Sequence, residues 1–253
     1  PLFWAINDYS DATLFTHALS RRGYKTGLEY RTVLDPDSRM TFQADFLEDR
    51  EVDDGQPQNA DDWGYSHDVY PRPNEDRYWV RMKLDHDLPG GFTGKLDLDW
   101  VSDQDYLIEF RDGYSSYNES REGFKKDFSR ILDAYEDPVR TNRLNLNKKG
   151  ALYSWNNSLT WYDNVNARRY LDENRTLQNL PRIQFDMLKQ PITPWPLYYS
   201  LNSDYTYFYS QDGAEGHRMD LHPGLYVPLF TSPFANLESF IGGRETVWRM
   251  NRF

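Results

Sequence analysis

A pattern in which every second side chain is apolar runs through residues 77–110. On residues 77–85, four apolar side chains alternate with arginine, lysine, aspartate and one tryptophan, and residues 95–100 repeat the alternation. Successive side chains of a β-strand point to opposite faces, so this spacing predicts two strands, each with one apolar and one charged face. Pro89-Gly90-Gly91 separates them, and glycine supplies the positive φ that a tight reversal needs. The segment is therefore predicted to form a β-hairpin.

The same alternation recurs along most of the chain and predicts about ten to twelve strands. Short turns and long polar loops join them, and this asymmetry of connections is typical of outer-membrane barrels. The predicted fold class is all-β, an antiparallel up-and-down meander that is part of a large transmembrane β-barrel. The predicted strands fall within residues 10–19, 24–32, 39–46, 77–88, 92–100, 139–147, 151–161, 182–187, 197–209, 219–229 and 246–249.

Three segments depart from the alternation. Residues 48–76 are polar, acidic and interrupted by prolines, and residues 163–180 are also polar, so both are predicted to be loops. Apolar residues recur at helical spacing within residues 121–135, and Pro138 follows. This spacing predicts a short amphipathic helix. A long loop that holds a few packed aromatic side chains is the open alternative.

Composition limits the partners and the environment. The chain has 253 residues, a formal net charge of −11 and an aromatic content of 16%. Nucleic acids and anionic lipids favour basic surfaces, so we expect no nucleic acid partner. The chain has no cysteine, which excludes disulfides and cysteine-based metal or redox sites. It also has no apolar run of about 18 residues, but a membrane-spanning strand needs only about 9–11 alternating residues.

Two environments fit strands with one apolar and one charged face. The apolar face meets either a protein core or lipid, and the charged face meets either bulk water or a water-filled lumen. Aromatic residues at the ends of successive alternating segments favour the membrane, where they form belts at both interfaces. Aromatic residues that cap the core of a soluble sandwich remain an alternative for any single one of them. These residues are Tyr24, Tyr78, Trp100, Trp161 and Tyr209.

No residue pattern indicates catalysis. The five histidines are scattered, without the spacing of a metal site. Asp97 and Asp99 share a strand face and resemble the carboxylate pair of a glycosidase, but Lys95 lies on the same face, which favours an ordinary polar strand face. We therefore predict no catalytic residue, no metal, no cofactor and no enzymatic activity.

Several longer segments resemble the LptD family, also called OstA or Imp, of lipopolysaccharide-assembly outer-membrane proteins. The most specific short pieces are Asn7-Asp8 with 10–13, Ser102-Asp103 with Tyr106 and Phe110, and Leu180-Pro181. The segments that carry the resemblance are PLFWAINDYSDATLFTHALSRRGYKTGLEYR, SRMTFQADFLED, DWVSDQDYLIEF, TNRLNLNKKGALYSWNNSLTWYDN and TLQNLPRIQFDM.

The resemblance implies a barrel in the outer membrane of a Gram-negative bacterium that inserts lipopolysaccharide into the outer leaflet. It implies four partners: lipopolysaccharide, outer-membrane lipid, an LptE-like plug lipoprotein in the lumen, and a periplasmic Lpt bridge component. The bridge component would bind an N-terminal jellyroll domain. Residues 1–253 would be a single barrel segment without the jellyroll and without the far half of the barrel.

Two features depart from the family pattern. Some members have disulfides, whereas this chain has no cysteine. The residues before Phe253 do not keep the alternation expected of a final barrel strand, so we interpret the end as a truncation. An incomplete barrel has unpaired strand edges, which favour aggregation, and we expect this segment alone to behave poorly.

The alternation assigns candidate residues to each face. The candidate lumen-facing residues are Arg81, Lys83, Asp97, Asp99, Asn145, Asn147, Asn156 and Ser158. The candidate lipid-facing residues are Tyr78, Val80, Leu96, Leu98, Trp100, Tyr153, Trp155 and Trp161. A soluble protein with a solvated polar face predicts the same alternation. Two alternatives therefore stay open, a secreted all-β carbohydrate-binding or glycan-processing protein and a generic porin.

Overall fold

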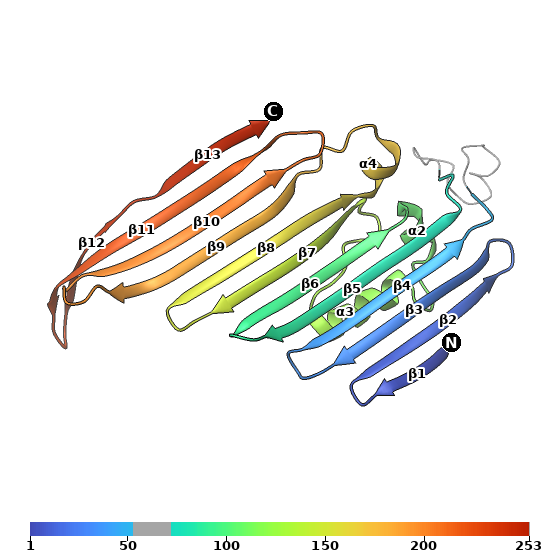
Figure 1. The fold of residues 1–253 in the computed structure, drawn as a ribbon, viewed down its shortest axis with the longest axis horizontal. Helices are drawn as coiled ribbons and strands as arrows, with labels where there is room; N and C mark the ends of the chain where they lie inside the picture. The colour runs from blue at the N-terminus through green and yellow to red at the C-terminus, as the bar shows by residue number, and fades with distance from the viewer. Residues whose placement is uncertain (53–71, 253) are drawn as a thin grey trace. The chain divides into compact units, whose positions relative to one another are not determined.

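The computed structural model describes residues 1–52 and 72–252, and in this part the chain forms thirteen strands. The first twelve strands follow one another in the sheet in sequence order as an antiparallel meander, and the thirteenth pairs with the eleventh (Figure 1). No strand pair among these residues closes the sheet. The all-β, up-and-down prediction is confirmed. The strands are β1 (Leu2–Asn7), β2 (Ser10–Leu19), β3 (Gly23–Val33), β4 (Arg39–Glu48), β5 (Asp76–Leu88), β6 (Phe92–Val101), β7 (Val139–Lys149), β8 (Tyr153–Asn164), β9 (Gln178–Pro191), β10 (Tyr198–Tyr209), β11 (Glu215–Thr231), β12 (Asn236–Gly242) and β13 (Glu245–Arg252).

The predicted hairpin is formed by β5 and β6, which are neighbours in the sheet. Gly90 and Gly91 in its turn have φ angles of 81° and 76°, in the region that glycine adopts without steric cost. The strand count is one above the predicted range, because residues 2–7 and 236–242 were not recognised as strands.

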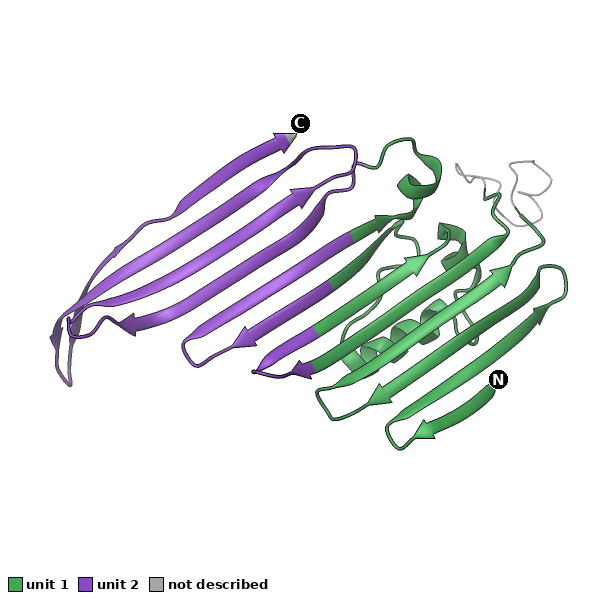
Figure 2. Cartoon of the chain, in the orientation of Figure 1, with its two compact units in different colours: residues 1–86, 95–143, 162–174 green, residues 87–94, 144–161, 175–253 purple. Residues whose placement is uncertain are grey.

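Two compact units make up the chain (Figure 2). Unit 1 comprises residues 1–86, 95–143 and 162–174, and unit 2 comprises residues 87–94, 144–161 and 175–253. The sequence-based interpretation was a single barrel segment over residues 1–253, and this remains a prediction.

In unit 1, the connection between β6 and β7 folds back over one face of the strands. It contains α2 (Gln104–Glu109) and α3 (Tyr117–Phe128). The Asp103 carboxylate caps α2 by accepting from the Tyr106 amide at 2.9 Å, and the Ser116 hydroxyl caps α3. The connection is thus an ordered layer of unit 1.

The helix α3 begins and ends earlier than the predicted 121–135. Ser129 adopts a left-handed conformation with φ of 55° and ends the helix, so residues 130–138 lie outside it. One further correction concerns a predicted loop, and another predicted loop is not tested. Residues 165–170 within the predicted loop 163–180 form a helix, α4 (Val165–Tyr170), and most of the predicted loop 48–76 lies outside the described residues.

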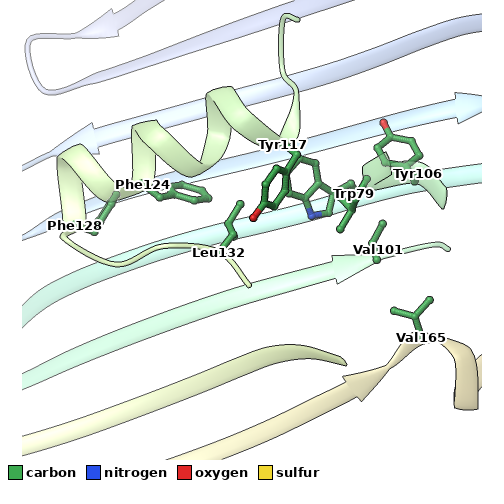
Figure 3. Packing of buried hydrophobic residues seen from close by; sticks show 9 residues of the cluster. Trp79, Val101, Tyr106, Tyr117, Phe124, Phe128, Leu132 and Val165 are labelled. Atoms are coloured by element: carbon green, nitrogen blue, oxygen red, sulfur yellow. The ribbon is translucent and has the colours of Figure 1, made fainter. Parts of the chain in front are cut away.

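The hydrophobic core of unit 1 lies between this connection and the strands. Trp79 of β5 is fully buried against Tyr117 of α3, and Leu132 packs beside them (Figure 3). Phe124 and Phe128, four residues apart on α3, are buried in the same cluster. The core therefore lies on the polar side of the sheet, because Trp79 belongs to the charged face of its strand.

In unit 2, two short strands pair with one long strand. The first half of β11 pairs with β13 over residues 215–221, and the second half pairs with β12 over residues 224–231. β12 and β13 therefore form one interrupted strand along β11, with the interruption at residues 243–244.

Candidate functional site

The apolar face of unit 1 is continuous across its first five strands. The cross-strand pairs Leu14–Leu28 and Phe42–Met82 are directly opposite each other, so apolar side chains follow one another across the sheet. A shallow hollow of about 600 Å³ on this face is lined only by apolar residues. Trp4, one of the lining residues, is 64% exposed. No layer formed by the described residues covers this face, which is the arrangement of a strand wall that faces lipid.

The predicted lipid-facing residues lie on the faces opposite the polar candidates. Tyr78 and Val80 pair with Phe46 and Ala44, and the Tyr78 ring contacts the Trp100 ring at 6.1 Å. In unit 2, the Trp155 ring contacts Phe92. Trp100 and Trp161 are exposed, and the other six are half-buried. The candidates therefore share an apolar side within each unit, and their contact with lipid stays a prediction.

The polar face of unit 1 is covered. Arg81 is fully buried and donates hydrogen bonds to Asp45 at 3.0 Å and to the Ser120 hydroxyl of α3 at 2.8 Å. Its guanidinium lies 3.8 Å from the centre of the Trp79 ring. Arg81 lies on the predicted polar side of the sheet, but other residues of the chain enclose it.

The three other candidates of unit 1 also form hydrogen bonds with other residues of the chain. Lys83 donates to Asp97 at 2.8 Å, and Arg130 from the covering connection donates to the same carboxylate at 2.8 Å. Asp99 is buried and accepts from the Trp79 indole at 2.8 Å. Arg81, Lys83 and Asp97 thus contact the covering connection, through Ser120, Phe124 and Arg130 respectively.

A second ionic cluster lies where α2 meets the ends of the strands. Arg77 is fully buried and donates to Asp103 at 2.7 Å, to Glu109 at 2.7 Å and to Asp49 at 3.0 Å. Arg22 also binds Asp49 and Glu109. Sequence reasoning noticed Ser102-Asp103 as a family signature but missed this role. The available signal was the position of Asp103 three residues before Tyr106, which is the spacing of a helix cap.

Burial and charge act in opposite directions on two carboxyls of this cluster. Burial of Asp103 disfavours its ionised form, but the charge and the hydrogen bonds of Arg77 outweigh this and hold the pKa of Asp103 well below its usual range. Burial raises the pKa of Glu109 to about 7, against the attraction of Arg22. Glu109 is therefore the group of this cluster that exchanges a proton near neutral pH.

The polar face of unit 2 carries a ladder of amide side chains. Asn145 donates to Asn156 at 2.6 Å, and Asn156 donates to Gln184 at 3.2 Å, so the ladder crosses three strands. Asn147 joins it through Asn145 at 3.3 Å, and Ser158 lies opposite Arg182 in the register. All four candidates in this unit are half-buried and share a polar side.

A groove with a volume of about 330 Å³ opens on this polar face, over β9, β10 and β11. Arg182 donates to Asp204 at 2.8 Å, and Asp220 accepts from Arg244 at 2.8 Å and from Arg218 at 3.1 Å. Sequence reasoning missed this groove, because Arg244 reaches it from the interruption between β12 and β13, which the alternation does not reveal. The groove is lined by Arg182, Gln184, Asp186, Asn202, Ser203, Asp204, Arg218, Asp220, His222 and Arg244.

Neither a metal-binding cluster nor a membrane-spanning helix is found in residues 1–52 and 72–252. No group of three or more histidine, cysteine, aspartate or glutamate side chains in this part of the chain is arranged to hold a metal ion. No helix in the same residues is long and apolar enough to cross a bilayer.

A meander of antiparallel strands with an uncovered apolar side and a polar side that is ionic or amide-lined defines a segment of an outer-membrane barrel wall. The chain belongs to the LptD family, because the family model described as LPS transport system D matches residues 75–253. The resemblance inferred from the sequence is thereby confirmed. No curated protein matches the chain.

Family membership sets the general role. LptD proteins are outer-membrane components of Gram-negative bacteria that act in lipopolysaccharide transport and outer-membrane assembly. Lipopolysaccharide and other components of that pathway are accordingly the general partners.

Proposed function

We propose that this chain is part of the wall of a translocon that inserts lipopolysaccharide into the outer leaflet of the outer membrane. The observation that carries the proposal is that, within each unit, one side of the strands is apolar and the other side is polar. Phe42 and Met82 lie on an uncovered apolar side, and Asn145 and Asn156 lie on a polar side. Lipopolysaccharide is an amphiphile, so a wall with two such sides can hold its lipid and its sugars in different environments.

The proposed transport needs no covalent step and therefore no catalytic residue. The sugar chain would move along side chains that exchange hydrogen bonds with hydroxyls as readily as water does. In unit 2, Asn145, Asn147, Asn156 and Ser158 remain our candidates for this surface. In unit 1, the connection 102–138 covers the polar strand residues, so its outer side would contact the sugar chain instead.

The finer partners are also proposals. We infer a plug lipoprotein on the polar side and outer-membrane lipid on the apolar side. A periplasmic bridge component would bind through a jellyroll domain. The polar side chains of unit 2 suit a hydrated occupant, whereas the uncovered apolar side of unit 1 suits acyl chains.

Photocrosslinking in cells tests the proposal. A photoreactive residue replaces Asn145 in the full-length protein, and Leu146, the next residue on the opposite face of β7, is the matched control. We expect crosslinks to lipopolysaccharide or to the plug lipoprotein from position 145 only. Equal crosslinking from both positions contradicts the assignment of the faces. A protein that stays monodisperse in buffer without detergent favours the soluble glycan-binding alternative.

A further inference from the structure

An exposed tryptophan lies on the polar side of unit 2. Trp248 of β13 pairs with Arg218 of β11, and Arg218 also pairs with Thr206 of β10, so these three side chains share a face. Arg218 lines the groove, and its guanidinium lies 5.4 Å from the Trp248 ring centre. Trp248 is 59% exposed on a face that also carries charged groups. A large aromatic ring in this position is typical of a binding surface.

A second ring supports Trp248. Phe208 of β10 stacks on it with the ring centres 6.3 Å apart and the planes at 16°. Gly216 lies opposite both Phe208 and Met250 in the register, so no side chain separates the two rings at this point. A Cβ atom on Gly216 would approach the Arg249 carbonyl oxygen to 2.6 Å. The close approach of the strands at Gly216 thus keeps the aromatic pair together.

The groove beside this aromatic pair is polar but electrically balanced. It contains three arginines and three aspartates, and each arginine is ion-paired with an aspartate of the groove. Asp204 and Asp220 are directly opposite each other in the register, and the arginines compensate their charges. The groove therefore offers many fixed hydrogen-bond donors and acceptors without an excess of either charge.

We propose that Trp248, Phe208 and the groove form a saccharide-binding subsite. A sugar ring has a face of C–H groups and a rim of hydroxyls. The C–H face packs on the exposed side of Trp248, and the hydroxyls exchange hydrogen bonds with carboxylates and guanidinium groups such as those of Asp220 and Arg218. The inference rests on the proposed function. It assigns a binding site for the sugar chain of lipopolysaccharide to particular residues of unit 2.

The balanced charge and the polar lining of the groove favour a saccharide over a phosphate group or an acyl chain. A phosphate group would favour arginines without carboxylate partners, whereas the arginines of this groove are paired. An acyl chain would favour an apolar lining, whereas the groove is lined by charged and amide side chains. A neutral or weakly charged sugar fits both the ring and the groove.

A binding measurement tests the subsite directly. The full-length protein with its plug partner is purified in detergent and titrated with the saccharide released from lipopolysaccharide by mild acid, which lacks lipid A. We expect Trp248→Ala to weaken binding about threefold to tenfold. We expect Trp248→Phe to retain most of the affinity, because it keeps a ring. The matched control is Val247→Ala, whose side chain points to the opposite face of the same strand and is 54% exposed.

Three results would overturn the subsite: unchanged binding by Trp248→Ala, equal weakening by Val247→Ala, or equally strong competition by inorganic phosphate. Retained heat-modifiable mobility in electrophoresis shows that each variant is a folded barrel. If Trp248→Ala fails this check, Arg218→Lys replaces it. Arg218→Lys keeps the charge but loses the planar fork, and we expect it to weaken binding by a similar factor.

An export measurement separates failure of the subsite from failure of the proposed function. Cells that depend on each variant export lipopolysaccharide either with a long sugar chain or truncated to its inner core. We expect Trp248→Ala to slow only the long form, by about threefold. Equal slowing of both forms overturns the subsite and leaves the proposed function intact. Normal surface lipopolysaccharide in cells depleted of the protein contradicts the proposed function itself.

Discussion

The polar sides of the two units carry similar residues in similar alternation, yet they are used differently. In unit 1, Arg81 and Asp99 are buried beneath a connection that brings its own hydrophobic residues to the sheet. In unit 2, Asn156 is half-buried and Arg182 is exposed, on a side that opens into a groove. The difference comes from the 37 residues between β6 and β7, Ser102–Pro138, which include α2 and α3. Alternation therefore determines the chemistry of a strand face but not what covers it.

The largest expected contrast between the units concerns buried and open arginines. Arg81→Met leaves Asp45 in a buried site without its closest cation, and we expect the free energy of unfolding to fall by about 3–5 kcal/mol. Arg182→Met removes an ion pair whose arginine is 47% exposed, and we expect a loss below about 1 kcal/mol. Guanidinium unfolding of the full-length protein in micelles measures both. Equal losses would contradict the distinction between the two sides.

Phe124 tests whether the covering connection is packed as a core. It is 1% exposed on the buried face of α3, so Phe124→Ala leaves a cavity and should cost about 3–4 kcal/mol. Phe234, which is 97% exposed, is the matched control, and we expect Phe234→Ala to change stability by less than about 0.5 kcal/mol. A small effect of Phe124→Ala in the same unfolding assay would show that the connection is loosely held.

Glu109 of unit 1 makes the free energy of unfolding depend on pH. Burial raises its pKa from the ordinary value of 4.5 to about 7 in the folded protein, so the folded state binds a proton that the unfolded state has already lost. The resulting stabilisation is complete below pH 4.5 and is lost as the pH rises through 7, by about 3 kcal/mol. Asp103 stays ionised throughout this window because its pKa is lowered.

The matched variant for this effect is Glu109→Gln, which cannot titrate. We expect its free energy of unfolding to change less than that of the parent protein between about pH 4.5 and 7.5. The same slope in both proteins would assign the pH dependence to other groups.

The smallest expected effect concerns the amide ladder of unit 2. Asn156→Ala removes hydrogen bonds to Asn145 and Gln184 on a half-buried surface, where water can replace the lost partner. We expect a loss of about 1 kcal/mol, measured by guanidinium unfolding. A loss as large as that of Arg81→Met would indicate that the polar side of unit 2 is closed to water.

The strand faces could be predicted from the sequence because a strand repeats every two residues. Tyr78, Val80 and Met82 were placed on one side by local spacing alone, and the register agrees. The cover over Arg81 could not be predicted in this way. Arg81 and Ser120 are 39 positions apart, and no local period encodes such a contact. Trp79 was one available sign, because a large aromatic residue on a charged face needs a partner layer, and the amphipathic spacing within residues 121–135 was another.

The groove and its aromatic pair escaped prediction for a related reason. Trp248 reaches the polar side of unit 2 because residues 243–244 interrupt the strand and β13 pairs separately with β11. The sequence predicted only the beginning of a last strand at residues 246–249. Without the register, the face to which Trp248 points is not defined.

Cysteine labelling of the full-length protein tests the central claim most directly, because the chain has no cysteine of its own. Ser120→Cys lies on the buried face of α3, where Ser120 is 2% exposed, and Ser158→Cys lies on the polar side of unit 2. With a small charged thiol reagent, we predict that Ser158→Cys reacts more than roughly tenfold faster, since Ser120→Cys must wait for local opening. Equal labelling rates at the two positions would contradict the account of one covered and one open polar side.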